Sequence, residues 1–131
     1  MEKIDVSEIR EMRDSKEVDI SPYVSEEKAA EPILIRLKTL TTKQQDEVQG
    51  YLSRFARTDR KTRDTYFNDE AWLHKSRIRM LLIGVDKDDP NFPFAKWDEQ
   101  FIDAVDERAP QLVRYLSDEL EELNRPLEQK T

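Results

Sequence analysis

The spacing of the apolar residues changes once along this chain of 131 residues. Between positions 17 and 40, apolar side chains take alternate positions, as in Val18 and Ile20 and again in Ile33, Ile35 and Leu37. That spacing is typical of half-buried strands. After position 41 they recur every third or fourth residue, as on one face of an amphipathic helix. The change predicts an α+β fold, in which a two-stranded β-ribbon precedes a mainly α bundle of about four helices.

The length suits a single domain, 1–131, with one modest core. The apolar stripe of residues 1–16 is thin, so we predict a flexible N-terminal arm that a partner could order. The ribbon is expected at 17–40, the helical bundle at 41–124 and a tail at 125–131. A two-stranded ribbon is marginal alone, so its apolar side chains are expected to lie on the helices or to pair with another subunit.

Capping residues mark the first helix of the bundle. Either Thr41 or Thr42 is expected to cap it, and Thr42 stands in capping-box spacing with Gln45. The helix is predicted to fray at 57–60. Its inner face is expected to combine five residues: Val48, Tyr51, Leu52, Phe55 and Ala56.

The second helix is the most apolar element and is predicted to form the centre of the core. It begins either at Asn68 or Asp69 after a loop, or as one long helix from about Thr62. Gly84 is expected to end it in the left-handed cap conformation. Its inner stripe is predicted to include Ala71, His74, Ile78, Leu81 and Val85, widened by Leu73, Met80 and Leu82.

Two further helices follow. Asp98 is expected to cap the first of them, and Pro110 to open the second, because proline suits the first helical turn. Asn124 and Pro126 should end the last helix. The side chains expected to face the core are Phe101, Ile102, Val105, Leu112, Val113, Leu116, Leu120 and Leu123.

Charged residues make up 39% of the chain and hydrophobic residues 37%, so the core must be small and the surface highly charged. The net charge of -7 is unevenly distributed. Residues 1–42 sum to -3, residues 43–84 to +3 and residues 85–131 to -7. The basic middle could therefore complement the acidic ends, within the fold or between copies.

Composition also excludes several classes of protein. The chain has no cysteine, which excludes disulfides and thiolate metal sites. No apolar run approaches the roughly 18 residues of a membrane span, and the acidic N-terminal stretch does not have the pattern of a signal peptide. We therefore expect a soluble, cytoplasmic protein without a membrane partner.

No set of residues predicts catalysis, a cofactor or a metal. His74 is the only histidine and has no cysteine or second histidine near it, so we expect a core or boundary residue. Asp86, Asp88 and Asp89 begin like a calcium loop, but a proline stands at its fifth position and Trp97 at its twelfth. An acidic, solvated turn is expected instead, and the chain is predicted not to be an enzyme.

Aromatic and basic side chains are the candidate protein-binding residues. Aromatic residues within a polar segment must either fill a core or meet a partner, and core filling is favoured for Trp97. A basic run interrupted by Asp59 and Asp64 could bind nucleic acid or an acidic protein surface, or serve solubility alone, and the net acidity disfavours nucleic acid. The candidates are Arg54, Arg57, Tyr66, Phe67, Phe92, Phe94 and Trp97.

Three stretches of the chain form a family-like pattern: RLKTLTTKQQDEVQG, LLIGVDKDDPNF and WDEQFIDAVDERAPQLVRYLSDELEELN. Through these stretches, residues 37–124 resemble the tail assembly chaperones of long-tailed bacteriophages and related prophages. The resemblance implies a small helical factor in the host cytoplasm that binds the tape measure protein and the tail tube protein during tail morphogenesis and is absent from the finished particle. Self-association is compatible with the ribbon and the charge asymmetry. A nucleic-acid-associated regulator and a generic protein-interaction adaptor remain as alternatives.

Overall fold

The computed structural model describes residues 3–28, 30–54, 56–58, 61–62, 65–67 and 69–125, with the backbone alone in 51–54, 56–58, 65–67 and 69–72. A two-stranded ribbon precedes four helices, which confirms the predicted α+β class. The elements in chain order are β1 (Ser15–Asp19), β2 (Leu34–Lys38), α1 (Thr42–Arg54), β3 (Ala56–Thr58), β4 (Thr65–Phe67), α2 (Asp69–Gly84), α3 (Glu99–Arg108) and α4 (Pro110–Leu123). Single 3₁₀ turns occur at Val6–Glu8 and Ser21–Tyr23.

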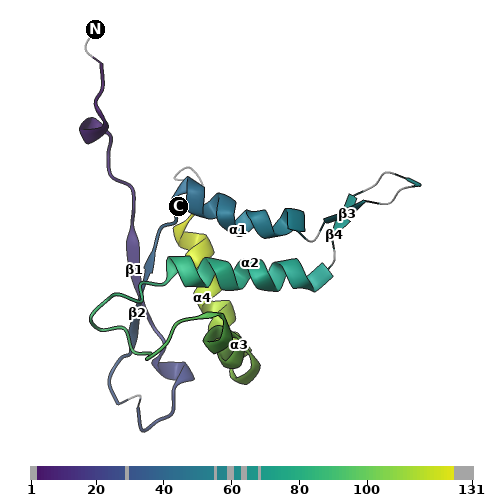
Figure 1. Ribbon diagram of the computed structural model, residues 1–131. Helices are drawn as coiled ribbons and strands as arrows, with labels where there is room; N and C mark the ends of the chain where they lie inside the picture. The colour runs from purple at the N-terminus through teal and green to yellow at the C-terminus, as the bar shows by residue number, and fades with distance from the viewer. Residues whose placement is uncertain are drawn as a thin grey trace.

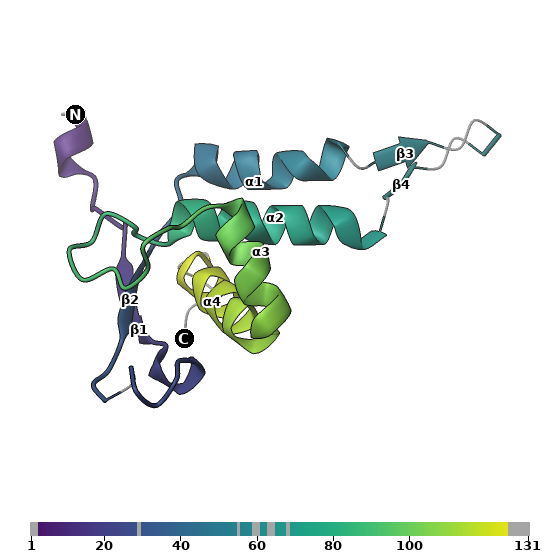
Figure 2. The same ribbon diagram turned by 60° about the horizontal axis from the view of Figure 1, so that its bottom comes forward.

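Helix α2 is the centre of the bundle, as its apolar sequence predicts. It lies antiparallel beside α1 on one side, and α3 and α4 lie on its other side (Figures 1 and 2). The ribbon stands at one end of the α1–α2 pair, and the β3–β4 hairpin projects from the other end (Figure 1). The residues before β1 extend away from the helices in the same view.

The β1–β2 ribbon is antiparallel, with Val18 opposite Ile35 and Lys16 opposite Leu37. Val18, Ile35 and Leu37 are buried, so the apolar face of the ribbon packs on the helices as expected. The free edge of β2 is covered by the chain after α2, where Leu37 pairs with Val85 and the N–H of Asp86 donates to the carbonyl of Arg36 at 2.9 Å. This pairing removes an exposed strand edge.

The core collects apolar side chains from all layers. Most of the predicted ribbon and helix positions whose side chains the structure describes meet in one cluster, and among these residues α4 contributes the most buried apolar side chains of any helix. The fully buried large residues are Ile20, Ile35, Leu37, Leu81, Val85, Ile102, Leu116 and Leu120. Leu73 is an exception to the predicted stripe, because its side chain is 48% exposed.

Gly84 does not take the left-handed conformation that we expected. Its role is close packing: a Cβ atom there would lie 2.6 Å from Leu120 Cδ2 and 3.2 Å from Leu40 Cδ1. The absence of a side chain lets the end of α2 approach α4. The chain then continues into the pairing with β2 rather than turning away, so a left-handed cap is not needed.

The helix starts match the predicted capping residues, with one correction. Thr41, not Thr42, caps α1: its Oγ1 accepts from the N–H of Gln44 at 3.2 Å, and Gln44 Oε1 accepts from the N–H of Thr41 at 2.9 Å. This is a capping box one residue earlier than the predicted Thr42–Gln45 pair, because the helix itself begins at Thr42. Asp98 Oδ1 accepts from the N–H of Phe101 at 2.8 Å and caps α3 as predicted.

The later boundaries also match in part. Helix α2 begins at Asp69, the loop-first alternative, and α4 begins at Pro110 and ends at Leu123 before Asn124. The predicted arm is two residues too long, because β1 begins at Ser15. The predicted tail after residue 125 lies outside the described residues.

The β3–β4 hairpin was not predicted. Helix α1 ends at Arg54, so Ala56 lies in β3 opposite Phe67 rather than on the helix face, and 57–58 is a strand rather than a fraying end. Strands of three residues are too short for a period-two pattern to be recognised among charged residues. The predicted inward position of Phe55 lies outside the described residues.

Candidate functional site

The loop 86–98 between α2 and α3, here called the aromatic loop, brings three predicted residues together. The rings of Phe92, Phe94 and Trp97 have centroid separations of 5.6–5.7 Å, and the Phe94 and Trp97 planes are stacked at 11°. Phe101 of α3 joins them, 5.2 Å from Phe94 and 6.0 Å from Trp97. These separations lie in the range of favourable aromatic pairs. We call the four rings the aromatic cluster.

All four side chains of the aromatic cluster are half-buried. Trp97 is also fixed by a hydrogen bond, because its Nε1–H donates to the carbonyl of Leu81 in the last turns of α2 at 3.0 Å. The inner side of the cluster therefore packs on the core, as expected for Trp97, and its outer side stays accessible. The sequence left two roles open for these aromatic residues, core filling and partner contact. Their geometry is compatible with both.

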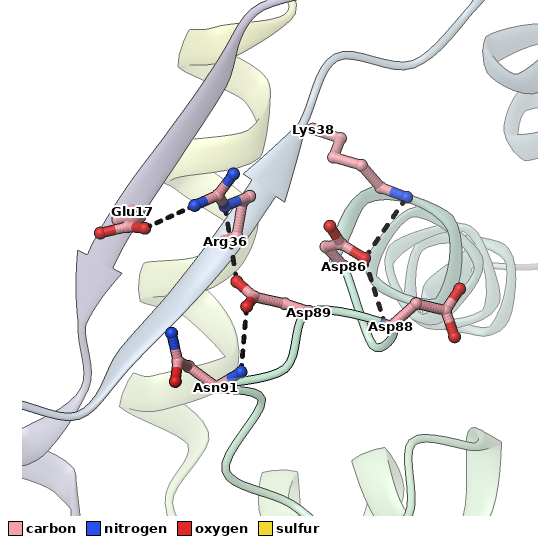
Figure 3. Close-up of polar contacts among 7 residues, drawn as sticks. All are labelled: Glu17, Arg36, Lys38, Asp86, Asp88, Asp89 and Asn91. Carbon is pink, nitrogen blue, oxygen red and sulfur yellow. Dashed lines mark hydrogen bonds and ion pairs between the residues drawn. The ribbon is translucent and has the colours of Figure 1, made fainter.

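Asp89 anchors the aromatic loop to the ribbon (Figure 3). Its Oδ2 lies 3.4 Å from Arg36 Nε, and its Oδ1 accepts from the N–H of Asn91 at 3.0 Å. Arg36 also pairs across the ribbon with Glu17 at 2.8 Å. The carboxylates of Glu17 and Asp89 raise the pKa of Arg36. One guanidinium thus bridges β1 and the loop, and the side chain of Asp89 is only 12% exposed.

Asp86 makes a second, weaker anchor. Its Oδ1 accepts from the N–H of Asp88 at 3.1 Å and lies 3.8 Å from Lys38 Nζ of β2 (Figure 3). The expected solvated acidic turn is therefore correct for the exposed Asp88 but not for Asp86 and Asp89, whose charges face cations of β2. Among the described residues, no group of three or more His, Cys, Asp and Glu side chains could hold a metal ion.

His74 lies on α2 at the boundary between core and surface and faces α3. Its Nε2 is 2.6 Å from Asp103 Oδ1 of α3, and both side chains are more than one-third exposed. The pair links two helices at the surface. Asp103 is the only polar partner of the His74 side chain among the residues that the structure describes.

The other predicted binding residues lie elsewhere in the fold. Arg54 ends α1, and Arg57 of β3 stands opposite Tyr66 of β4, next to Phe67. Only their backbone is described. The hairpin leaves from the start of α2 and the aromatic loop from its end (Figure 1). The predicted set therefore divides into two groups and is not one site.

The structure contains two apolar surfaces that the sequence did not identify as sites. Ile4, Val6 and Ile9 of the arm are 65–81% exposed. A groove of about 510 Å³ lies between α1, α2 and the end of α4, next to the exposed Leu73. A helical stripe indicates that residues share a face, but it does not reveal whether the facing helix covers all of that face. Leu73 was therefore assigned to the core.

Comparison of the chain with protein-family models, with curated proteins and with solved structures gives no match. Of the helices that the structure describes, none combines the length and the apolar character needed to cross a membrane. The fold and site define an α+β chain with an anchored, half-exposed aromatic cluster. Such a surface is suited to contact with another protein.

Proposed function

We propose that this chain is a non-enzymatic binding factor of the phage tail assembly chaperone type. In this proposal the aromatic cluster contacts the tape measure protein and the tail tube protein in the cytoplasm of a bacterial host. The observation that carries the proposal is the partly exposed aromatic cluster on a loop that Asp89 holds to the ribbon and Trp97 holds to α2. The resemblance of residues 37–124 to such chaperones supplies the identity of the partners.

Aromatic residues are enriched at the centres of protein interfaces and account for a large share of their binding free energy. A contact surface on a preformed loop loses little conformational entropy on binding. The Asp89–Arg36 pair and the Trp97 hydrogen bond provide that preorganisation here. An apolar aromatic surface can contact the apolar face of an amphipathic helix, which is the chemistry expected of a long helical tape measure protein.

The test is co-expression of the full chain with the tape measure protein of the same phage, followed by size-exclusion chromatography with light scattering. We expect a soluble complex with several copies of the chain. A tape measure protein that stays insoluble beside the free chain would overturn this partner, and loss of binding to both the tape measure and the tail tube protein would overturn the proposed function.

The contact surface is tested with a matched pair of variants. Phe94→Ser removes the ring that contacts the other three members of the cluster. Tyr115→Ser removes a ring that stacks on Tyr23 at 5.8 Å, away from the aromatic loop. We expect the first variant to lose partner binding by about tenfold or more and the second to retain it, with both folded by circular dichroism. Equal binding by both variants would exclude the cluster as the contact surface.

A further inference from the structure

The N-terminal arm, residues 3–14, carries apolar side chains that are exposed to solvent. Four of the six strongly exposed large hydrophobic residues of the described chain lie in it, namely Ile4, Val6, Ile9 and Met12. The 3₁₀ turn is held by polar contacts alone, since the N–H of Asp5 donates to Glu8 Oε1 at 3.2 Å and Ser7 Oγ donates to Asp5 Oδ2 at 2.7 Å. The arm thus has a local conformation but buries none of its apolar residues.

The direction of the arm is fixed at its base. The carbonyl of Asp14 accepts from both the N–H and Oγ1 of Thr39, at 3.0 and 2.8 Å, and Arg13 Nη2 donates to the carbonyl of Thr39 at 3.0 Å. From Arg10 to Asp14 the chain runs without a turn, and it leads away from the helices (Figure 1). The arm is therefore presented to other molecules rather than folded back on its own bundle.

The groove between α1, α2 and the end of α4 is a mainly apolar hollow in the part of the chain that the structure describes. Leu40, Val48, Leu73 and Met80 line it, and Leu73 is 48% exposed. Its volume of about 510 Å³ lies within the range of binding pockets in proteins, about 300–1,000 Å³. Arg77 stands in its wall, exposed and without an ion pair in the described part of the chain.

We propose that the arm of one copy docks into this groove of a second copy. The two surfaces match in polarity, since among the described residues the arm exposes Ile4, Val6 and Ile9 and the groove exposes Leu73. They also differ in the sign of their net charge, because residues 3–14 sum to -1 and the charged residues that line the groove, Arg77, Arg125 and Glu121, sum to +1. The contact is heterologous: different patches of the two copies meet, which permits a reciprocal dimer or a growing chain. It goes beyond the proposed function and uses neither phage protein nor aromatic cluster.

Two variants separate the two halves of the contact. The arm variant carries Ile4→Ser and Ile9→Ser, and the groove variant carries Leu73→Glu. All three positions are exposed, so the fold should tolerate the changes. Arg77→Glu, one turn further along α2, is a second groove variant for use if Leu73→Glu does not fold. Leu34→Ser is the control, because Leu34 is 40% exposed on β2, outside both surfaces.

The measurement is light scattering of the full chain over a range of concentrations, alone and in mixtures. We expect the wild-type mass to rise with concentration and the Leu34→Ser control to match it. The arm variant alone and the groove variant alone should each dissociate at least about tenfold more readily. Mixed together, they should form a 1:1 complex that does not grow, because the mixture has one intact arm facing one intact groove.

Three results would overturn the proposal. A wild-type chain that is monomeric at every concentration would exclude the contact between copies. An arm that docks in the groove of its own copy would give this result. Variants that associate as strongly as the wild type would exclude these surfaces. A mixture of folded variants that remains monomeric would exclude the pairing of arm with groove. None of these results depends on a phage partner, so they are distinct from a failure of the proposed function.

Discussion

Gly84→Ala tests the packing of α2 on α4. A Cβ atom at this position would lie 2.6 and 2.9 Å from the two terminal methyl groups of Leu120 and 3.2 Å from Leu40 Cδ1. Leu120 is fully buried, so its methyl groups have little room to move. Overpacking of this kind lowers the free energy of unfolding by about 1–3 kcal/mol. Alanine in place of a helical glycine raises it by about 0.5–1 kcal/mol. We expect the steric term to win, with a net loss of about 1–2 kcal/mol.

The assay is urea unfolding together with a thermal melt, where this loss should lower Tm by roughly 3–8 °C for a chain of this size. Gly50→Ala is the matched control: Gly50 lies within α1, and its Cβ would meet no atom within 4 Å. It should stabilise the chain by about 0.5–1 kcal/mol. A Gly84→Ala chain as stable as the wild type would refute the close-packing argument.

A double-mutant cycle locates the strain. Leu120→Ala alone should destabilise the chain by about 2–5 kcal/mol, because it leaves a cavity in the core. In the combined variant the new Cβ at position 84 occupies part of that cavity. The combined loss should therefore be smaller than the sum of the two single losses, by about 0.5–3 kcal/mol. Strict additivity would place the strain of Gly84→Ala somewhere other than Leu120.

Three further outcomes follow from single side chains. Asn124→Ala removes the amide oxygen that accepts from the N–H of Leu40 at 2.7 Å. It should lower the free energy of unfolding by about 1–3 kcal/mol, seen as a lower urea midpoint with an unchanged m-value. Asp98→Ala should cost about 1 kcal/mol and Asp98→Asn less, because asparagine can still cap α3. The backbone N–H of Ser21 lowers the pKa of Asp19, so this contribution to stability is present above the ordinary carboxyl pKa and is lost as pH falls through the lowered one. A series of melts at decreasing pH should therefore fall less steeply for Asp19→Asn than for the wild type.

The regular elements were predictable because local signals suffice for them. In α4, the proline at the first position, the apolar stripe and the asparagine at the end all agree, and the structure has the helix at Pro110–Leu123. The alternation around Val18 and Ile35 likewise predicted the ribbon and its buried face. In these elements the apolar positions of one face are the buried ones, so the sequence pattern and the burial coincide.

Features that depend on distant partners were not predictable. The role of Gly84 is decided by Leu120 of another helix, and the state of Asp89 by Arg36 of β2. Neither partner is adjacent in sequence, so no local pattern contains the contact. The β3–β4 hairpin was missed for a different reason, since strands of three residues carry almost no periodic signal.

The candidate site was predictable in composition but not in geometry. Phe92, Phe94 and Trp97 are conspicuous in a polar segment, and the structure brings them together. Their stacking with Phe101 and the anchoring of the loop through Asp89 required the fold. The predicted aromatic residues of the hairpin lie in a different part of the molecule, because the chain reverses before α2.

The packing of α1 links the small core to the proposed contact between copies. Of the α1 side chains that the structure describes, only Val48 is buried. Polar contacts supply much of the remaining attachment, including the ion pair of Glu47 with Arg79 and the hydrogen bond from Ser76 to the carbonyl of Val48. Exposed ion pairs contribute little to stability, so the described part of α1 depends mainly on Val48 for its attachment to α2. An arm that fills the groove beside Leu73 would contact both helices, so self-association should stabilise the α1–α2 pair.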